Sequence, residues 1–269
     1  MIKTYTDFIT NVLQETSKIA LSYFGKVGGT TKEGDNNQVL TQTDLEIGQY
    51  IITKINETFP DHNIIDEEAG VIDKQSEYTW IIDPIDGTSN FASGVPLYGI
   101  MIGFLQGSEP IAGGIALPTF HEIYTAEKGQ GAFCNGERIR VASETKLLSS
   151  LVAYQIDGHQ ENPQITTEEC ALLADIVLQI RNVRNGGSCF DTAMVAKGKY
   201  GAYLNRTSKI WDNVPEQILI TEAGGIYTDF FGKPMDYSNP LQKAKDNFTL
   251  CAGSPVLHKQ LQEIIHKNK

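Results

Sequence analysis

The sequence of 269 residues is poor in the side chains that bind zinc or form disulfide bridges. It has five histidines and only four cysteines, Cys134, Cys170, Cys189 and Cys251, which lie far apart along the chain. Zinc sites and disulfide frameworks use closely spaced cysteines or paired histidines. We therefore expect no structural zinc. The first residues also lack the charged and then apolar pattern of a signal peptide, so we expect a reducing, cytoplasmic location.

Positive charge is scarce as well. Lys and Arg number 22 against 33 Asp and Glu, which gives a net charge of −11. A nucleic-acid backbone would be repelled by such a protein, so a nucleic-acid partner is not expected. No apolar run reaches the ~18–20 residues that a membrane span needs, so a membrane is not expected either. An acidic protein that binds phosphates must neutralise its pocket locally, and divalent cations do this.

The length favours one catalytic unit made of two packed halves. Residues 1–144 are predicted to form an α+β half with an antiparallel sheet and a metal site, and residues 145–269 an α/β half. In the first half, apolar periodicity predicts helices at 5–24 and 45–59 and strands at 63–66, 78–83, 98–105, 111–117 and 122–126. In the second half, strands at 151–155, 200–204 and 249–252 alternate with helices at 167–180, 188–196, 214–223 and 255–266.

The segment DPIDGTSNF, residues 83–91, follows the apolar run of the second strand. Pro84 has no N–H group and is expected to end the strand, while Asp83 and Asp86 offer two hard oxygen ligands for Mg²⁺ across a tight turn. Gly87 and Thr88 can begin a helix, whose free N–H groups suit a phosphate. Taken alone, the segment also fits an ordinary acidic turn with Thr88 as a helix cap.

Two further acidic positions stand out. Asp66, Glu67 and Glu68 follow another short apolar run, and taken alone they are typical of a solvated loop. Two neighbouring strands that both end in acids are nevertheless unfavourable unless cations bridge the acids. Trp211 and Asp212 precede a helical stretch, where a packed indole beside a capping aspartate is the ordinary interpretation.

Together, these segments resemble the inositol monophosphatase family, the lithium-sensitive, magnesium-dependent phosphatases. The aspartate motif reads WIIDPIDGTSNF over residues 80–91, and the C-terminal motif reads WD at 211–212 with EAGG at 222–225. Further segments that are similar to the family's sequences lie at 40–44, 129–136 and 186–188, so the resemblance covers most of the chain. It implies an α/β (α+β) fold, a layered αβαβα sandwich of the inositol monophosphatase and sugar phosphatase type.

The resemblance also implies a site for two or three Mg²⁺ ions. Glu67, Asp83 and the backbone carbonyl of Ile85 would hold the first ion. Asp83, Asp86 and Asp212 would hold the second, and a third, weaker ion would lie near Glu67.

The catalytic residues implied by the family are Glu67 and Thr88, with Asp44 polarising the threonine. They would orient and deprotonate the water that attacks phosphorus in line, without a phosphoenzyme. Backbone amides of Gly87 and Thr88 would cradle the phosphate. The substrate-binding residues implied are Asp86, Gly87, Thr88, Gly187, Ser188, Cys189, Asn205 and Asp212.

No arrangement in the sequence suggests a covalent nucleophile. Ser188 and Cys189 are the nearest candidates, but no histidine lies at a convincing position to activate them. The histidines are interpreted as surface or structural residues, and Cys189 as a small packed side chain. Relatives are commonly dimers, so a homodimer is expected, and so is inhibition by millimolar Li⁺.

The sequence departs from the family around the substrate. Asn205 stands where inositol-binding members usually carry an acid, seven positions before Asp212. Asn213 and Pro215 replace residues that are usually small, and Asp66 replaces a common glycine. The substrate is therefore open: inositol 1-phosphate, fructose 1,6-bisphosphate, the 2′-phosphate of NADP and 3′-phosphoadenosine 5′-phosphate are all candidates. A non-catalytic regulatory protein is the alternative from another class, although every implied metal ligand is present.

Overall fold

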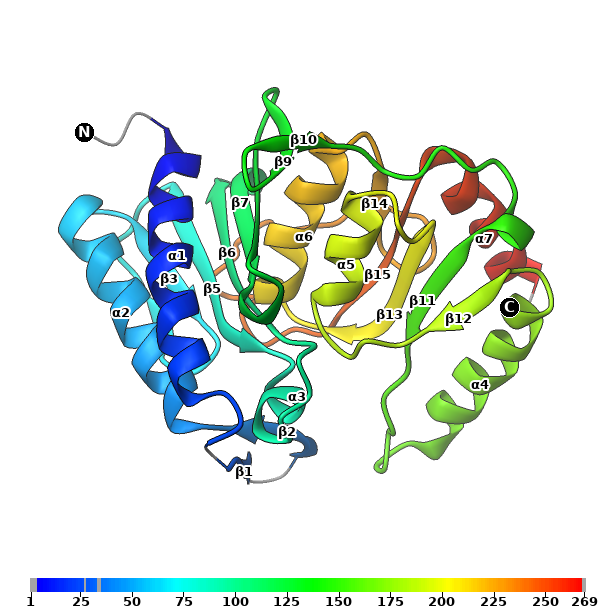
Figure 1. Cartoon of the computed structure of the whole chain (residues 1–269), viewed down its shortest axis with the longest axis horizontal. Helices are drawn as coiled ribbons and strands as arrows, with labels where there is room; N and C mark the ends of the chain where they lie inside the picture. Colours follow the sequence, from blue (N-terminus) through cyan, green and yellow to red (C-terminus); the bar gives the residue numbers. More distant parts are fainter. Residues whose placement is uncertain (1–3, 27, 33–34, 268–269) are drawn as a thin grey trace.

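The computed structural model describes residues 4–26, 28–32 and 35–267 of the chain. Its elements form five layers (Figure 1). Helices α1 (Tyr5–Tyr23) and α2 (Gln42–Thr58) make the first outer layer, and α4 (Pro163–Val177) and α7 (Pro255–Lys267) the second. Between them lie two sheets, separated by α5 (Phe190–Ala196) and α6 (Ile210–Glu222). The αβαβα sandwich expected from the sequence is confirmed.

The first sheet has eight strands in the order β10-β9-β8-β7-β6-β5-β3-β4. They are β3 (Asn63–Asp66), β4 (Gly70–Ile72), β5 (Tyr78–Asp86), β6 (Gly99–Gln106), β7 (Glu109–Leu117), β8 (Glu122–Glu127), β9 (Gly131–Cys134) and β10 (Glu137–Ile139). All neighbours are antiparallel except β3 and β5, which are parallel. Sequence periodicity predicted the longer strands and missed β4, β9 and β10, because three or four residues carry too little pattern.

The second sheet has five strands in the order β12-β11-β13-β15-β14. They are β11 (Leu151–Gln155), β12 (Asn182–Arg184), β13 (Ala202–Ser208), β14 (Ile226–Thr228) and β15 (Phe248–Gly253). Strands β11, β12 and β13 are parallel, and β15 is antiparallel to its neighbours. The first sheet thus ends before residue 140 and the second begins after residue 150, while the division into halves at residue 144 stays a prediction.

Shorter elements complete the fold. They are the hairpin β1 (Thr30–Lys32) and β2 (Asp35–Leu40), helix α3 (Thr88–Ala92), and the 3-10 turns η1 (Pro118–Phe120) and η2 (Leu147–Ser149). Helix α2 begins three residues earlier than periodicity predicted, because Thr41 caps it. The Thr41 hydroxyl accepts from Thr43 N at 3.2 Å, and the Asp44 carboxylate accepts from Thr41 N at 2.9 Å.

Helix α6 is pressed closely against the first sheet at two glycines. A Cβ atom on Gly103 would lie 2.7 Å from Val214 Cγ1, and one on Gly113 would lie 2.7 Å from Ile218 Cγ2. The absence of a side chain at these sheet positions lets the helix backbone approach. The other side of α6 packs toward β14 and β15 of the second sheet. One helix therefore connects the two sheets and carries Asp212 to the junction between them.

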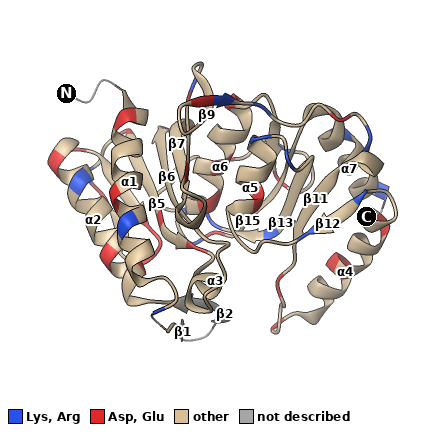
Figure 2. Ribbon diagram, viewed as in Figure 1, with Lys and Arg blue, Asp and Glu red and all other residues tan. Residues whose placement is uncertain are grey.

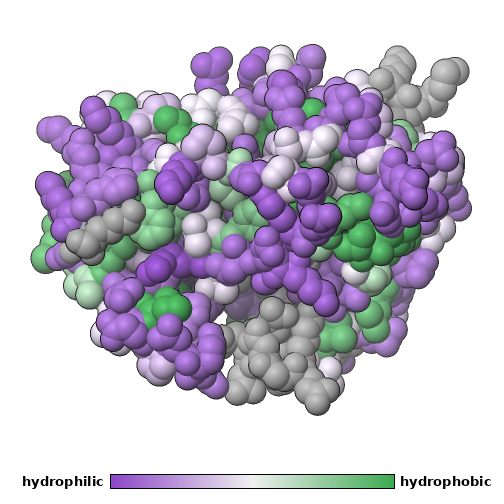
Figure 3. All heavy atoms as spheres, turned by 180° about the vertical axis from the view of Figure 1, so that it is seen from behind, coloured by the Kyte–Doolittle hydropathy of each residue, from purple (hydrophilic) through white to green (hydrophobic). Residues whose placement is uncertain are grey.

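The surface is mainly polar. Seen from behind, hydrophilic side chains cover most of the face, with hydrophobic patches between them (Figure 3). Acidic residues are distributed over the outer helices α1, α2 and α4 (Figure 2). Among the described residues, no helix is both long and apolar enough to cross a membrane.

Candidate active site

A bulge in β5 brings Asp83 and Asp86 to the same side of the strand. The register with β6 pairs Asp83 with Met101 and Asp86 with Gly99, so three steps along β5 match two along β6. Residues three apart on a regular strand point to opposite faces, and an extra residue reverses this. The strand therefore does not end at Pro84, as the sequence suggested. It continues through a bulge that contains the proline, because a bulged position needs no ladder N–H group.

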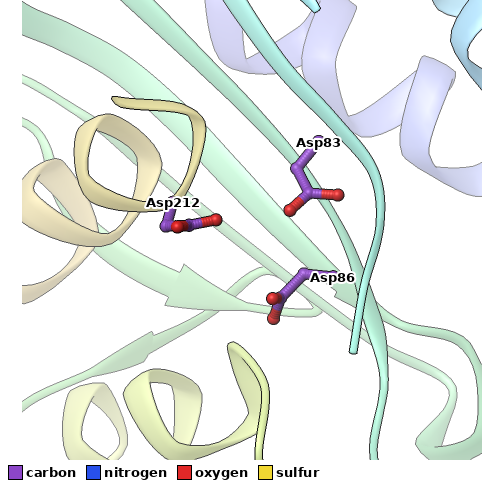
Figure 4. A group of neighbouring side chains, drawn as sticks. All are labelled: Asp83, Asp86 and Asp212. Carbon is purple, nitrogen blue, oxygen red and sulfur yellow. The ribbon is translucent and has the colours of Figure 1, made fainter. Parts of the chain in front are cut away.

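Asp83, Asp86 and Asp212 converge at the end of β5 (Figure 4). Each offers a carboxylate oxygen, and these oxygens all lie within 4.8 Å of one another. Burial raises the pKa of Asp83 well above its ordinary value, and the charges of Glu67, Asp86 and Asp212 raise it further. Burial likewise raises the pKa of Asp86 and of Asp212.

The donor set fits a hard divalent cation. Buried carboxylates this close repel one another unless they share protons or cations. Asp83 Oδ1 is fully buried and has no hydrogen-bond partner within the described part of the chain. Since buried polar atoms are normally satisfied, this oxygen is free to act as a ligand. All-oxygen ligands of this kind suit Mg²⁺.

The first turn of α6 positions Asp212. Lys209 is the N-cap residue, and its backbone N–H donates to Asp212 Oδ2 at 2.6 Å. Asp212 also lies at the positive end of the helix dipole, which favours a negative charge there. This confirms the capping aspartate of the ordinary interpretation, and the same carboxylate faces Asp83 and Asp86.

Asp66 and Glu67 have separate roles. Asp66 is buried, and its Oδ1 accepts from Glu68 N at 2.9 Å and from Ala69 N at 2.7 Å. It therefore shapes the turn after β3. Glu67 is fixed by its own N–H, which donates to Ile82 O at 3.2 Å, and its side chain lines the same cavity as Asp83.

Thr88 lies between Asp44 and the turn after β5. Its hydroxyl is 2.8 Å from Ile85 O and 3.2 Å from Asp44 Oδ1. Asp44 is buried behind it, and its pKa is raised by this burial, partly offset by hydrogen bonds from Thr41. The structure thus places Thr88 in contact with Ile85 in the same turn and with Asp44, which lies 44 residues earlier in the chain.

The glycine at position 87 is required by its surroundings. Its φ angle is 82°, which favours glycine, and a Cβ atom there would lie 2.8 Å from Ser188 Cβ. Cys189 N donates to Asp86 Oδ2. Asn90 Nδ2 donates to Gly186 O at 2.8 Å, so the turn at α3 and the loop before α5 are held together.

These groups surround a cavity of about 350 Å³. Of the residues predicted from the sequence, the cavity lining includes Glu67, Asp83, Ile85, Asp86, Gly87, Thr88, Gly187 and Asp212. Asp44, Ser188 and Cys189 lie directly behind the lining, in contact with it. No histidine is found among the described lining residues, and Cys189 is buried, as expected for a packed side chain.

Asn205 is placed differently. It is buried in β13, where its Oδ1 accepts from Thr207 N at 2.8 Å and its Nδ2 lies 3.3 Å from Tyr203 Oη. It is not among the described lining residues. The lining nearby is made by Thr207 and Lys209, so any role of Asn205 toward substrate stays a prediction.

Sequence reasoning missed the outer part of the cavity. Besides Ser89 and Asn90, this part is lined by Gln155, Ile156, Asp157, Asn185, Thr207, Ser208, Lys209 and Trp211. Most of these residues lie where strands of the second sheet end, and nothing in their local pattern separates them from ordinary loop residues. The one local signal is an amide or acid at or just after the end of a predicted strand, as at Gln155 and Asp157.

The layered fold, with buried carboxylates at the junction of its sheets, defines the class of αβαβα phosphatases. A sequence model described as "Inositol monophosphatase family" matches residues 1–268. The chain therefore belongs to the inositol monophosphatase family.

Individual relatives agree with this assignment. A fructose-1,6-bisphosphatase/inositol-1-monophosphatase of Aquifex aeolicus is 29% identical over 268 residues, which cover 99% of this chain and 97% of the relative. Inositol monophosphatase 1 of Bos taurus is 31% identical over 255 residues, 88% of this chain and 92% of the relative. The structure of a Thermotoga maritima IMPase is similar with a TM-score of 0.84 at 27% identity, covering 98% of this chain and 97% of that one.

Proposed function

We propose that this protein is a Mg²⁺-dependent phosphomonoesterase that hydrolyses inositol 1-phosphate or a related small sugar or polyol phosphate with an activated water. The observation that supports it most directly is the cluster of the buried Asp83 with the half-buried Asp86 and Asp212, all three of which line one cavity. Membership in a phosphatase family supplies the reaction class.

The residues that would hold magnesium are those expected from the sequence. Glu67, Asp83 and the carbonyl of Ile85 would hold one ion, and Asp83, Asp86 and Asp212 a second. Ile85 O accepts from Thr88 Oγ1, but a carbonyl oxygen has two lone pairs and keeps one for a cation. Bound divalent cations lower the pKa of water and stabilise the charge on a leaving oxygen.

The remaining groups would orient the reactants. Thr88, whose hydroxyl lies 3.2 Å from Asp44 Oδ1, would present its oxygen to a water that Glu67 would also contact, and this pair would fix the water in line with phosphorus. Positioning of this kind accounts for a large share of catalysis in phosphoryl transfer. The backbone N–H groups at Gly87 and Thr88 lie next to the cavity and would bind phosphate oxygens.

A bisphosphate substrate is the second candidate. The relatives from Aquifex aeolicus and Thermotoga maritima carry both activities in their names. In this chain, Lys209 is a cation among the lining residues, and its Nζ donates to Lys245 O at 3.0 Å. A phosphate that displaced this carbonyl would gain a charge-assisted hydrogen bond.

Phosphate release from a panel of substrates tests the proposal. The panel contains inositol 1-phosphate, fructose 1,6-bisphosphate, NADP and 3′-phosphoadenosine 5′-phosphate, each with Mg²⁺ and with EDTA. We expect Mg²⁺-dependent release from at least one sugar or polyol phosphate and loss of release in Asp83→Asn. Asp236→Asn, which changes an aspartate with a 71% exposed side chain, is the matched control and should keep activity. No turnover of any substrate would refute the proposal and favour a regulatory protein. Preference for 3′-phosphoadenosine 5′-phosphate would favour a phosphatase for that nucleotide.

Three further expectations remain proposals. Li⁺ at millimolar concentration should inhibit the enzyme, and insensitivity would count against the assigned metal arrangement. Light scattering should give the mass of a homodimer. Fractionation should place the protein in the cytoplasm.

A further inference from the structure

Glu216 is a buried acid on α6 that the proposed reaction does not use. It lies four residues after Asp212, is 2% exposed, and is not among the described lining residues of the cavity. Its Oε1 accepts from Thr192 Oγ1 at 2.7 Å. Its Oε2 is 2.9 Å from Tyr227 Oη, and the same hydroxyl is 2.9 Å from Asn213 Oδ1.

The amide of Asn213 has only one possible orientation. Its Nδ2 group is 2.5 Å from Lys209 O, which accepts only, and 2.8 Å from Ser208 Oγ. The Ser208 hydroxyl donates its own hydrogen to Phe248 O at 3.1 Å, so it accepts from Asn213. Both amide hydrogens are thus used, and Asn213 Oδ1 faces Tyr227 as an acceptor.

The single hydroxyl hydrogen of Tyr227 decides the protonation of Glu216. A carbonyl oxygen cannot donate, so Tyr227 must donate to Asn213 Oδ1. The 2.9 Å contact between Tyr227 Oη and Glu216 Oε2 then needs a hydrogen from Glu216. With an ionised carboxylate there, the single Tyr227 hydrogen would satisfy only one of the two oxygens, and either Asn213 Oδ1 or Glu216 Oε2 would be left without a hydrogen. Burial raises the pKa of Glu216 to about 8, with the charges of Asp86 and Asp191 adding to the rise and Thr192 and Tyr227 opposing it.

We propose that Glu216, as a neutral acid, is a positioning residue for the metal ligand Asp212, which it reaches through Tyr227 and Asn213. This path of hydrogen bonds reaches Asp212 through the backbone of Lys209. Asn213 Nδ2 donates to Lys209 O, and Lys209 N donates to Asp212 Oδ2. The backbone at Lys209 is therefore held on both sides. This inference rests on the proposed function only in taking Asp212 as a Mg²⁺ ligand.

The consequence is a dependence of Mg²⁺ affinity on groups outside the cavity. When Tyr227 loses its hydroxyl, the Asn213 amide can turn away from Lys209 O, which then keeps only the backbone N–H groups of Asp212 and Asn213 as donors. The first turn of α6 then holds the Asp212 carboxylate less firmly. Loss of the groups that orient metal ligands typically weakens metal binding about 10–100-fold.

The test measures Mg²⁺ binding by titration calorimetry on the metal-stripped full-length chain, far below the melting temperature. We expect Tyr227→Phe to weaken binding at least about tenfold and Glu216→Ala to do the same. Glu216→Gln keeps a donor toward Tyr227 and an acceptor toward Thr192, so it should bind within about twofold of the wild type. Tyr237→Phe is the matched control, because it removes another buried hydroxyl that donates to α6, at Gln217 Oε1, outside the path.

The outcomes are distinct. Unchanged affinity in Tyr227→Phe, or a loss in Tyr237→Phe as large as in Tyr227→Phe, would overturn the positioning role. A loss in Glu216→Gln as large as in Glu216→Ala would overturn the neutral acid. Should Glu216→Ala fail to fold, Tyr227→Phe and Glu216→Gln still decide both questions. Failure of the wild type to bind Mg²⁺ would instead refute the proposed function, and this inference with it.

Discussion

Asp83→Asn should stabilise the metal-free protein while removing its response to Mg²⁺. Asp83 is buried, lies beside Asp86 and Asp212, and has a carboxylate oxygen without a hydrogen-bond partner in the described structure. Asparagine has nearly the same shape without the charge. The substitution therefore relieves repulsion in the absence of cations and removes a ligand in their presence.

The size of the effect follows from the distances. Two unit charges 4.8 Å apart repel by about 3 kcal/mol at an effective dielectric constant of about 20. Uptake of a proton by one acid relieves part of this, so we expect a gain in the free energy of unfolding of about 1–3 kcal/mol at pH 8 in EDTA.

The gain should depend on pH in a definite direction. The pKa of Asp83 is raised in the folded protein. An acid with a raised folded pKa binds its proton more tightly when folded, so its contribution to stability is fully present below the unfolded pKa of about 3.9 and is lost as pH rises through the folded pKa. Asparagine does not titrate. The difference between variant and wild type in EDTA should therefore be near zero at low pH and grow as pH increases.

Urea unfolding followed by tryptophan fluorescence measures this at several pH values, with EDTA and with saturating Mg²⁺. Wild type should gain stability from Mg²⁺, since a ligand that binds only the folded state stabilises it. Asp83→Asn should gain little, and the exposed Asp236→Asn should respond like wild type. Equal Mg²⁺ stabilisation of Asp83→Asn and wild type, or a destabilised variant in EDTA at pH 8, would refute the reasoning.

Three other predictions follow from the same site. Mg²⁺ affinity should rise with pH, because protons compete for Asp83, Asp86 and Asp212, whose pKa values are raised. Calorimetry in two buffers of different ionisation enthalpy should show proton release, and pH-independent affinity would contradict this. Gly99→Ala should destabilise the fold by about 1–3 kcal/mol, because its Cβ would lie 2.3 Å from Cys189 Sγ, whereas Gly158→Ala, with open space around it, should leave the melting temperature unchanged. Asp66→Ala should lower the free energy of unfolding in urea by about 1–3 kcal/mol and weaken Mg²⁺ binding, because the turn that carries Glu67 loses two hydrogen bonds. If neither quantity changes, the turn holds its shape without these bonds.

Local pattern was sufficient for the long elements and for the acids. Helices α1 and α2 follow from apolar periodicity, because one face of each packs on a core. Strands β5 to β7 follow from short apolar runs, because residues on both of their faces are buried. The carboxylates Glu67, Asp83, Asp86 and Asp212 follow from motifs that place an acid at the end of a strand or in the first turn of a helix. Their convergence, which the family resemblance implied, is seen in the structure as one cavity.

Other features depend on contacts between distant segments. The bulge at Pro84 exists because β5 must pair with β6 on both sides of it, and the short strands β4, β9 and β10 exist only as partners of longer ones. The burial of Asn205 likewise depends on its neighbours in β13. The protonation of Glu216 depends on its neighbours in α5 and β14.

The sequence by itself determined which chemical groups are present and on which elements they lie, because periodicity, capping and turn chemistry act over a few residues. Only the tertiary structure decided which of these groups meet, which are buried and which carry a proton. Burial and the distances between charges depend on contacts in three dimensions, and segments far apart in the sequence make these contacts.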